Sequence, residues 1–220
     1  MATKDVNYPN AFDGIAESWY RLRHWTRFKT ELEELAARWG SGTLLNIGCA
    51  HGPDFMPFKD KFILYGLDSS YQMVRMAVKY SEKFTFPVNL VTADAVHLPF
   101  AAHSFNWIIA VAIYHHIEDA GGREKAFDEL HRIIKPGGEA FITVWNHWQR
   151  KFLFKWKQVA VPWRTKEGLF KRYHYLYNYI EIEQKLKKHG LKILKSRPEK
   201  LYTGRFKYCS RNICILVKAA

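Results

Sequence analysis

Short apolar segments alternate with helical ones through the middle of the chain, and this order constrains the fold more than any other feature. Five apolar segments are typical of buried strands, at residues 44–47, 63–67, 88–91, 107–112 and 140–144. Between them, Ser69 or Ser70 is placed to cap a helix to about Lys79, and apolar residues recur at helical spacing from Arg123 to Ile134. Parallel strands need such crossover connections, so the order predicts a parallel, doubly wound sheet.

The flanking segments complete the prediction of an α/β fold. Residues 10–39 mix apolar and charged residues as a helical segment does, and this pattern ends before Gly40. Asn178 and Glu181 form a capping box for a helix to His189, and two segments that follow, at residues 191–196 and 212–218, predict an antiparallel strand pair. We therefore expect one domain over residues 1–220, with a seven-stranded, mostly parallel sheet and helices on both faces. The basic, aromatic segment at about residues 146–180 is expected to be a substrate-binding insertion.

Composition argues against several classes of protein. The first five residues lack the basic and apolar regions of a signal peptide, and the longest apolar run, residues 107–114, is too short to cross a bilayer. The three cysteines, Cys49, Cys209 and Cys214, have neither metal-ligand spacing nor the even number of a disulfide framework. We therefore expect a cytoplasmic protein with reduced thiols, no bound metal and no membrane association.

Positive charge is concentrated in the last third of the chain. Residues 147–220 carry 19 Lys and Arg against 4 Asp and Glu, whereas residues 1–146 carry 15 against 17. Aromatic residues are mixed with these cations, namely Trp148, Trp156, Trp163, Tyr173, Tyr175, Tyr177 and Tyr179. Cations bind phosphates and aromatic faces stack on unpaired bases, so the segment favours a nucleic-acid surface. The alternatives are lysines that serve solubility alone and a basic membrane-surface helix, although the segment has no sustained amphipathic period.

A glycine loop follows the first predicted strand directly, and a carboxylate ends the second. The glycines of the loop Gly48-Cys49-Ala50-His51-Gly52 allow the backbone to approach a ligand closely. About 20 residues further on, Asp68 can accept hydrogen bonds from both hydroxyls of a ribose. The G-x-x-x-G spacing differs from the G-x-G-x-x-G of dinucleotide-binding dehydrogenases. Asp94, after the third strand, supplies a carboxylate where an adenine amino group would lie, unless it only caps a turn.

These motifs, together with Ser104-Phe105-Asn106-Trp107 and the segment from Leu130 to Gly138, resemble class I S-adenosylmethionine-dependent methyltransferases over roughly residues 10–146. The resemblance implies a Rossmann-like fold with S-adenosylmethionine as cofactor. The residues expected at the cofactor are Asn46, Gly48, Cys49, Ala50, Gly52, Asp68, Ser69, Asp94, Ala95 and Val111.

Two positions depart from the family pattern. Asn46 stands where the family usually has an acid, and Ala50 stands where it usually has a glycine. An asparagine can accept a hydrogen bond but cannot attract the ammonium or sulfonium group of the cofactor as a charge. We therefore expect weaker cofactor binding than usual by the isolated chain.

A narrower resemblance is to the wobble-uridine tRNA methyltransferases, which esterify carboxymethyluridine and work with a small zinc-binding activator subunit. The stretches that carry it are residues 12–16, Arg23-His24-Trp25, residues 111–116, Val144-Trp145 and Arg172-Tyr173-His174. The resemblance implies tRNA as substrate and partner. The residues expected to bind the substrate are Tyr114, His115, Trp145, Tyr173 and His174.

The chemistry of such a reaction can be argued from elementary principles. A carboxylate with a pKa near ~4 is ionised at pH 7, so it needs no general base to attack a sulfonium methyl group. Catalysis then depends on holding the oxygen and the methyl carbon at near-attack distance. Arg23 or Arg172 would bind the carboxylate bidentately, and we predict both as catalytic residues. His116, at the carboxyl end of the fourth strand, is expected to orient the substrate.

Other functions are compatible with parts of the sequence. A class I methyltransferase of a small molecule or lipid quinone would not need the basic, aromatic segment. A non-catalytic RNA-binding module would not need the glycine loop together with Asp68 and Asp94, and a dehydrogenase would favour different glycine spacing.

The third strand is expected at one edge of the sheet, where unpaired backbone groups need a cover. Because the resembled enzymes rely on an activator, we expect that subunit to add a strand at Phe86–Val91 and form a heterodimer. The alternative is that Lys79, Lys83 and the turn at Pro87 already protect this edge.

Overall fold

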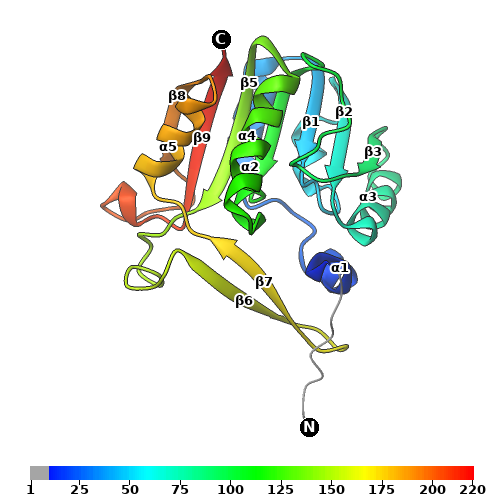
Figure 1. Ribbon diagram of the computed structural model, residues 1–220. Coiled ribbons are helices and arrows are strands. Elements are labelled where there is room, and N and C mark those ends of the chain that lie inside the picture. The colour runs from blue at the N-terminus through cyan, green and yellow to red at the C-terminus, as the bar shows by residue number, and fades with distance from the viewer. Residues whose placement is uncertain (1–9) are drawn as a thin grey trace.

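A seven-stranded sheet forms the centre of the computed structural model, which describes residues 10–220 (Figure 1). The strand order is β3-β2-β1-β4-β5-β9-β8. The strands are β1 (Gly42–Ile47), β2 (Phe62–Asp68), β3 (Asn89–Thr92), β4 (Phe105–Val111), β5 (Ile134–Trp145), β8 (Leu191–Pro198) and β9 (Asn212–Ala219). Strands β1 to β5 run parallel, and β9 pairs antiparallel with both β5 and β8. The predicted α/β class, the seven strands and the antiparallel C-terminal pair are confirmed.

Helices cover both faces of the sheet because its strands alternate side chains between the two faces. Leu45 and Ile108 pack with α4 (Ala120–Ile133) and α5 (Tyr179–Lys188), whereas Leu44 and Ile109 pack with α2 (Lys29–Trp39). The helix α3 (Tyr71–Lys83) lies beside β2 and β3 and contributes Tyr80 to the hydrophobic cluster that contains Leu44, Ile109 and the buried face of α2. The predicted N-caps are present: Ser70 accepts a hydrogen bond from the Met73 amide, and Asn178 accepts one from the Glu181 amide. The capping box is incomplete, because the Glu181 carboxylate binds Lys157 and Tyr175 instead.

The segment predicted to be helical over residues 10–39 consists of two helices. The prediction of one continuous helical segment was therefore wrong. The first helix, α1 (Ala11–Leu22), ends at Arg23 before α2 begins. Carbonyl groups in the break are bound by distant side chains: the ring of His51 contacts the Arg23 carbonyl, and the Tyr80 hydroxyl donates to the His24 carbonyl at 2.9 Å. These tertiary contacts replace helical hydrogen bonds and turn the chain towards the glycine loop.

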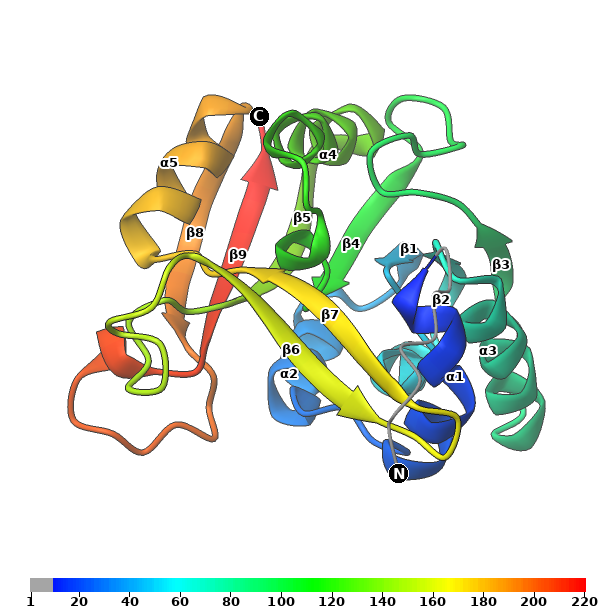
Figure 2. The same ribbon diagram turned by 60° about the horizontal axis from the view of Figure 1, so that its bottom comes forward.

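The basic, aromatic segment folds as a hairpin outside the main sheet, which its composition did not predict. Strands β6 (Gln158–Arg164) and β7 (Leu169–Tyr175) pair antiparallel as a separate two-stranded sheet. Figures 1 and 2 show this hairpin crossing below the carboxyl ends of the parallel strands, with its tip beside α1. The Trp163 indole donates a hydrogen bond to Ser18 at 2.8 Å, which ties the hairpin to that helix.

Two further predictions concern the ends of elements and of the chain. β5 begins at Ile134 and runs through Pro136, Gly137 and Gly138, so the predicted fifth strand at 140–144 was too short. The expectation about a signal peptide concerns residues outside the described part of the chain. On the question of membrane spans, no helix within residues 10–220 is long and apolar enough to cross a membrane.

Close contact between α1 and the hairpin predicts that Gly14→Ala destabilises the protein. A Cβ atom at Gly14 would overlap the ring of Phe170 on β7, so that ring and its strand must shift. We expect the free energy of unfolding to fall by about 1–3 kcal/mol in urea titrations, despite the better helix propensity of alanine. Glu17→Ala, at an exposed site of the same helix, is the control. Equal stability of Gly14→Ala and the wild type would contradict this packing.

Candidate active site

The loop after β1 has a backbone shape that suits glycine. Gly48 has a φ of 69°, and a Cβ atom there would lie 2.7 Å from Cδ1 of Ile113. Ala50 has a φ of 48°, in the left-handed region that alanine adopts only at a cost. The position where the sequence departs from the family pattern is therefore one where a glycine would fit with less strain.

Asp68 holds this loop in place at the end of β2. One carboxylate oxygen accepts the Ala50 amide at 2.9 Å, and the other accepts the Ser70 amide at 2.9 Å. Burial raises the pKa of Asp68 to about 6, although the two amide hydrogen bonds lower it. Each oxygen retains lone-pair capacity, so the carboxylate can accept hydrogen bonds from two ribose hydroxyls. Asp68 is therefore chemically suited to its predicted role of binding the ribose of a nucleoside.

A cavity of about 620 Å³ opens beside this loop at the carboxyl ends of β1, β2 and β4. Of the residues expected at the cofactor, those that line it are Gly48, Cys49, Ala50, Asp68, Ser69, Asp94, Ala95 and Val111. Asp94 also accepts the Val96 amide at 3.0 Å, so it caps a turn as well as facing the cavity. These residues fit an adenosine group with its ribose near Asp68, since a ligand there would meet carboxylates and a closely approaching backbone.

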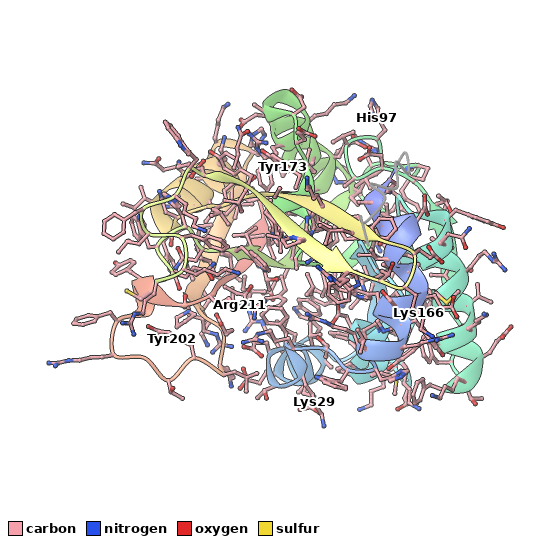
Figure 3. The ribbon with its side chains drawn as sticks, turned by 90° about the horizontal axis from the view of Figure 1, so that it is seen from below. Lys29, His97, Lys166, Tyr173, Tyr202 and Arg211 are labelled. Atoms are coloured by element: carbon pink, nitrogen blue, oxygen red, sulfur yellow. The ribbon has the colours of Figure 1, made fainter. Side chains whose placement is uncertain are left out.

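The other end of the same cavity is cationic and aromatic. Its lining includes the predicted Arg23, His115, His116, Trp145, Arg172 and His174, together with Trp19, Trp163 and Arg211. Figure 3 shows the hairpin crossing this region, with Arg211 on one side and Lys166 at the tip of the hairpin. The Arg172 guanidinium lies 5.4 Å from the ring of Trp19 and 5.1 Å from that of Trp163. Two tryptophans therefore hold this cation in place.

Within residues 10–220, no carboxylate forms an ion pair with Arg23, Arg172 or Arg211. Arg172 is only 7% exposed, and its Nε has no hydrogen-bond partner among the described residues. Burial, together with the charges of Arg23 and Arg211, lowers the pKa of Arg172 to about 10. The guanidinium stays charged at pH 7 and lacks a counter-ion, so this end of the cavity is suited to an anion.

Three histidines line the cavity close to Arg172, and all are neutral at pH 7. Burial, and then the charge of His174, lowers the pKa of His116 to about 3, and burial lowers the pKa of His174 to about 4. Burial also lowers the pKa of His115 well below its usual value. Nδ1 of His116 donates to the Tyr173 carbonyl at 2.8 Å, which leaves its Nε2 as an acceptor. His116 is therefore equipped to orient a substrate.

The histidine cluster also resembles a metal site, which the sequence analysis did not identify. One ring nitrogen each from His115, His116 and His174 lies within 4.8 Å of the others. The Trp145 amide donates to Nδ1 of His115 at 3.3 Å, so the neutral ring of His115 carries its proton on Nε2. A metal at Nε2 of His115 would have to displace this proton, and the neighbouring guanidiniums oppose a cation. The Nε2 atoms of His115 and His174 have no hydrogen-bond partner among the described residues, so they remain available to a polar ligand.

Four residues expected at the site lie outside the cavity lining. Tyr114 is fully buried and its ring packs 4.8 Å from that of Phe127. It is a core residue, so the prediction that it binds the substrate is corrected. Tyr173 reaches the site only through its carbonyl, which binds His116. Gly52 serves the loop conformation, with a φ of 95°. Asn46 is fully buried, and neither polar atom of its side chain has a partner among residues 10–220.

Sequence reasoning missed Trp19, Lys151 and Arg211 as cavity residues. Arg211 had a usable signal, because it directly precedes β9. An antiparallel strand beside β5 begins where β5 ends, at the carboxyl edge of the sheet that carries the site. Trp19 had no such signal, since only the packing of α1 against the hairpin brings its ring to Arg172.

Comparisons with known proteins agree with this geometry. Residues 45–142 match the family model described as a methyltransferase domain. The chain is 28% identical over 156 residues to the tRNA (carboxymethyluridine(34)-5-O)-methyltransferase of Arabidopsis thaliana. The aligned region covers 69% of this chain and 36% of that protein. The match therefore spans about a third of the length of that relative.

Solved structures share the fold. A S-adenosylmethionine-dependent methyltransferase from Clostridium acetobutylicum ATCC 824 superposes with a TM-score of 0.75 and 16% identity, over 96% of this chain and 100% of that one. A complex between the Haloferax volcanii Trm112 methyltransferase activator and the putative methyltransferase gives a TM-score of 0.67 and 16% identity, over 95% of this chain and 96% of that one.

The raised pKa of Asp68 predicts that cofactor affinity depends on pH. A proton competes with the ribose hydroxyls for the carboxylate, so affinity for S-adenosylmethionine should be full above about pH 7 and fall as the pH drops through about 6. Calorimetry from pH 5 to 8 is the measurement. Asp68→Asn should bind more weakly, by about 2–3 kcal/mol at pH 7, and lose this dependence.

Asp54 provides the control, because burial raises its pKa to about 6 as well and it lines the same cavity. Asp54→Asn should keep the pH dependence of the wild type. The same pH dependence in Asp68→Asn as in the wild type would place the titrating group elsewhere.

The glycine loop, the carboxylate that ends β2 and the cavity beside them form one site, and the family match covers the loop and the carboxylate. S-adenosylmethionine is the cofactor that these findings support. The chain therefore has the fold of S-adenosylmethionine-dependent methyltransferases, matches a methyltransferase-domain model over residues 45–142, and resembles the class I enzymes and, among them, the tRNA carboxymethyluridine methyltransferases.

Proposed function

We propose that this protein methylates tRNA, on the carboxylate of a carboxymethyl-type modified wobble uridine. The observation that carries the proposal is the set of three guanidiniums without acidic partners at one end of the cofactor cavity. Buried cations of this kind are stabilised by an anionic ligand. The similarity to a tRNA carboxymethyluridine methyltransferase supports the same class of substrate.

The roles of the residues follow from the charge of such a substrate. S-adenosylmethionine, when bound, supplies a methyl group activated by the positive sulfonium. Arg172, held between two tryptophan rings, would bind the substrate carboxylate, and Arg23 would share that charge. The carboxylate is already ionised, so no residue has to remove a proton. Catalysis then rests on positioning the oxygen for in-line attack.

The neutral histidines suit orientation better than proton transfer. His116 keeps its proton on Nδ1, bonded to the Tyr173 carbonyl, and its Nε2 accepts a hydrogen bond from the substrate. The pKa of this ring is lowered to about 3, far from the operating pH that an efficient general base requires. His174 is fixed in the same manner, by a 3.0 Å bond from its Nδ1 to the Arg172 carbonyl.

The proposal predicts that Arg172→Ala and Arg172→Lys lose activity by about 100-fold or more in kcat/KM, because lysine lacks the bidentate geometry of arginine. The measurement is mass spectrometry of tRNA nucleosides before and after incubation with enzyme and cofactor. General tRNA affinity should change little, because one cation among many contributes a small share of phosphate binding.

Arg164→Ala, at an exposed position of β6, is the matched control and should retain activity. Full activity of either Arg172 variant would remove that residue from the proposed mechanism. A methylated product other than an ester on tRNA would replace the proposed substrate.

We further propose that a small zinc-binding activator adds a strand at β3. This strand lies at the edge of the sheet and pairs only with β2 among the described strands. Leu90 and Val91 are partly exposed there, and Tyr71 on the neighbouring helix is 59% exposed. Phe86 was expected at this contact, but it is 6% exposed and packs on Phe55 and Tyr80, so it is excluded from the proposed surface. The similar fold solved with the Haloferax volcanii Trm112 activator supports this type of partner.

The edge proposal predicts that Leu90→Lys prevents co-purification with the activator. A charge at the edge strand opposes addition of another strand, whereas the fold and cofactor site should remain intact. Co-expression followed by affinity capture, with thermal unfolding of the chain alone, is the measurement. Leu194→Lys is the matched control, because Leu194 is 38% exposed and lies in β8 at the opposite edge. Capture that is lost equally in both variants, or in neither, would contradict the proposed contact.

A further inference from the structure

Two loops that are separated by residues 158–198 in the sequence form one surface next to the cavity. Residues 146–157 follow β5, and residues 199–211 precede β9. The ring of Trp148 in the first loop lies 5.8 Å from that of Tyr208 in the second. The Asn146 amide donates to the carbonyls of Tyr208 and Ser210, at 2.6 and 2.8 Å. Figures 1 and 2 show the two loops side by side, on the side of the molecule away from α3.

Large apolar side chains project from this surface into solvent. We call it the loop surface, and its most exposed members are Phe154 at 97%, Trp156 at 89%, Phe206 at 65%, Leu201 at 63% and Tyr208 at 47%. Exposed side chains of this size on two adjoining loops are unusual on a protein without a partner. The aromatic residues of the hairpin differ, because Trp163 is bound to Ser18 and packs 4.9 Å from the ring of Trp19.

Most cations of the two loops lack an acidic partner. Lys157 pairs with Glu181 and Lys200 with Glu34, but the remaining cations of the two loops form no ion pair with a described residue. They are Arg150, Lys151, Lys155, Arg205, Lys207 and Arg211. The acid of these segments, Glu199, is buried and accepts the Asn212 amide. The loop surface is therefore both aromatic and uniformly positive.

The loop surface borders the substrate end of the cavity. Lys151 and Arg211 line the cavity, as does Trp145 at the end of β5. The Arg211 guanidinium lies 5.1 Å from the ring of Trp145, which connects the loop to the cavity wall. An RNA whose modified base enters the cavity can therefore place its neighbouring nucleotides on the loop surface.

We propose that the loop surface binds the unpaired nucleotides on either side of the methylated one, by stacking bases on Phe154, Trp156 and Phe206. Unpaired bases present flat faces to aromatic side chains, and the flanking cations bind their phosphates. A lipid surface would also accept aromatic and basic side chains, but it gives no reason for the patch to border the cavity of the methyl-accepting group. This inference rests on the proposed function and adds the second loop, 199–211, to the RNA-binding surface.

The test compares an RNA stem-loop that carries the modified uridine with the free modified nucleoside. Phe154→Ala and Phe206→Ala should each raise KM for the stem-loop about tenfold or more, because each removes one stacking platform. The kcat for the stem-loop, the activity on the free nucleoside and the affinity for cofactor should stay at wild-type values. Ile63→Ala is the matched control, because Ile63 is 58% exposed at the start of β2, at the opposite end of the sheet from the cavity.

A fluorescent base reports the contact directly. 2-Aminopurine placed next to the modified uridine should be quenched when the stem-loop binds, and Phe154→Ala or Phe206→Ala should reduce that quenching. Unchanged KM and unchanged quenching in both variants would overturn the proposal. Binding to phosphatidylserine vesicles that both variants lose, with KM for the stem-loop unchanged, would overturn it in favour of a lipid surface.

The same measurements separate this inference from the proposed function. A wild-type protein that quenches the probe through Phe154 and Phe206 but does not methylate the RNA would overturn the proposed function alone. A wild-type protein that methylates the RNA with no change in the variants would overturn the loop surface alone.

Discussion

The buried Arg172 guanidinium is the contact on which the substrate half of the molecule depends. Trp19 on α1 and Trp163 on β6 hold it from two sides, while Arg172 itself belongs to β7. Helix and hairpin are thereby joined around a single cation. Burial of a charge without a counter-ion is costly, and attraction to the two rings offsets only part of that cost. The cation cannot move into solvent without unpacking the hairpin, so an anion in the cavity is the remaining way to stabilise it.

The two ends of the cavity carry opposite charge, and this division fits transfer of a methyl group to a carboxylate. Asp68 and Asp94 lie at the end that fits adenosine, whereas Arg23, Arg172 and Arg211 lie at the other. In the proposed reaction the ester product would have no negative charge, so the guanidiniums would hold it less strongly than the carboxylate. The same loss of charge limits how tightly they should bind the substrate, because ground-state stabilisation slows the step. The tryptophan faces partly stabilise the guanidinium charge. Unlike an acidic partner, they do not compete with an anionic ligand for its hydrogen-bond donors.

Local patterns in the sequence predicted most of the fold, whereas contacts between distant segments produced the differences. The strands of the sheet and the caps at Ser70 and Asn178 follow from neighbouring residues, and all are present. The break after α1 depends on His51 and Tyr80, which bind its carbonyls from 28 and 56 residues away. Side chains alternate between exposed and partly buried along β6, which is typical of a strand. The charge and aromatic content of this segment predict a binding surface but do not specify a hairpin.

The same distinction explains the predictions for the site. Asp68 could be found because its role depends on its place at the end of a strand, and the loop that it binds is its neighbour across the sheet. Tyr114 lies beside two histidines of the cavity in the sequence, yet a turn of 3-10 helix directs its ring into the core against Phe127. Proximity in sequence at the end of a strand therefore does not decide which side chain faces the site.

Asn146 explains why the cavity and the loop surface are coupled. It directly follows β5 and forms a bridge with Tyr177, which connects it to the segment after the hairpin. Its side-chain amide binds the carbonyls of Tyr208 and Ser210, and its side-chain oxygen accepts the Trp148 amide at 3.0 Å. Asn146 therefore connects three segments at the carboxyl edge of the sheet, two through its fully buried side chain and the third through the backbone bridge. Because β5 is a central strand, these segments are positioned by the rigid part of the fold, and the proposed RNA substrate, bound across the loops, would be held at a fixed place relative to the cavity.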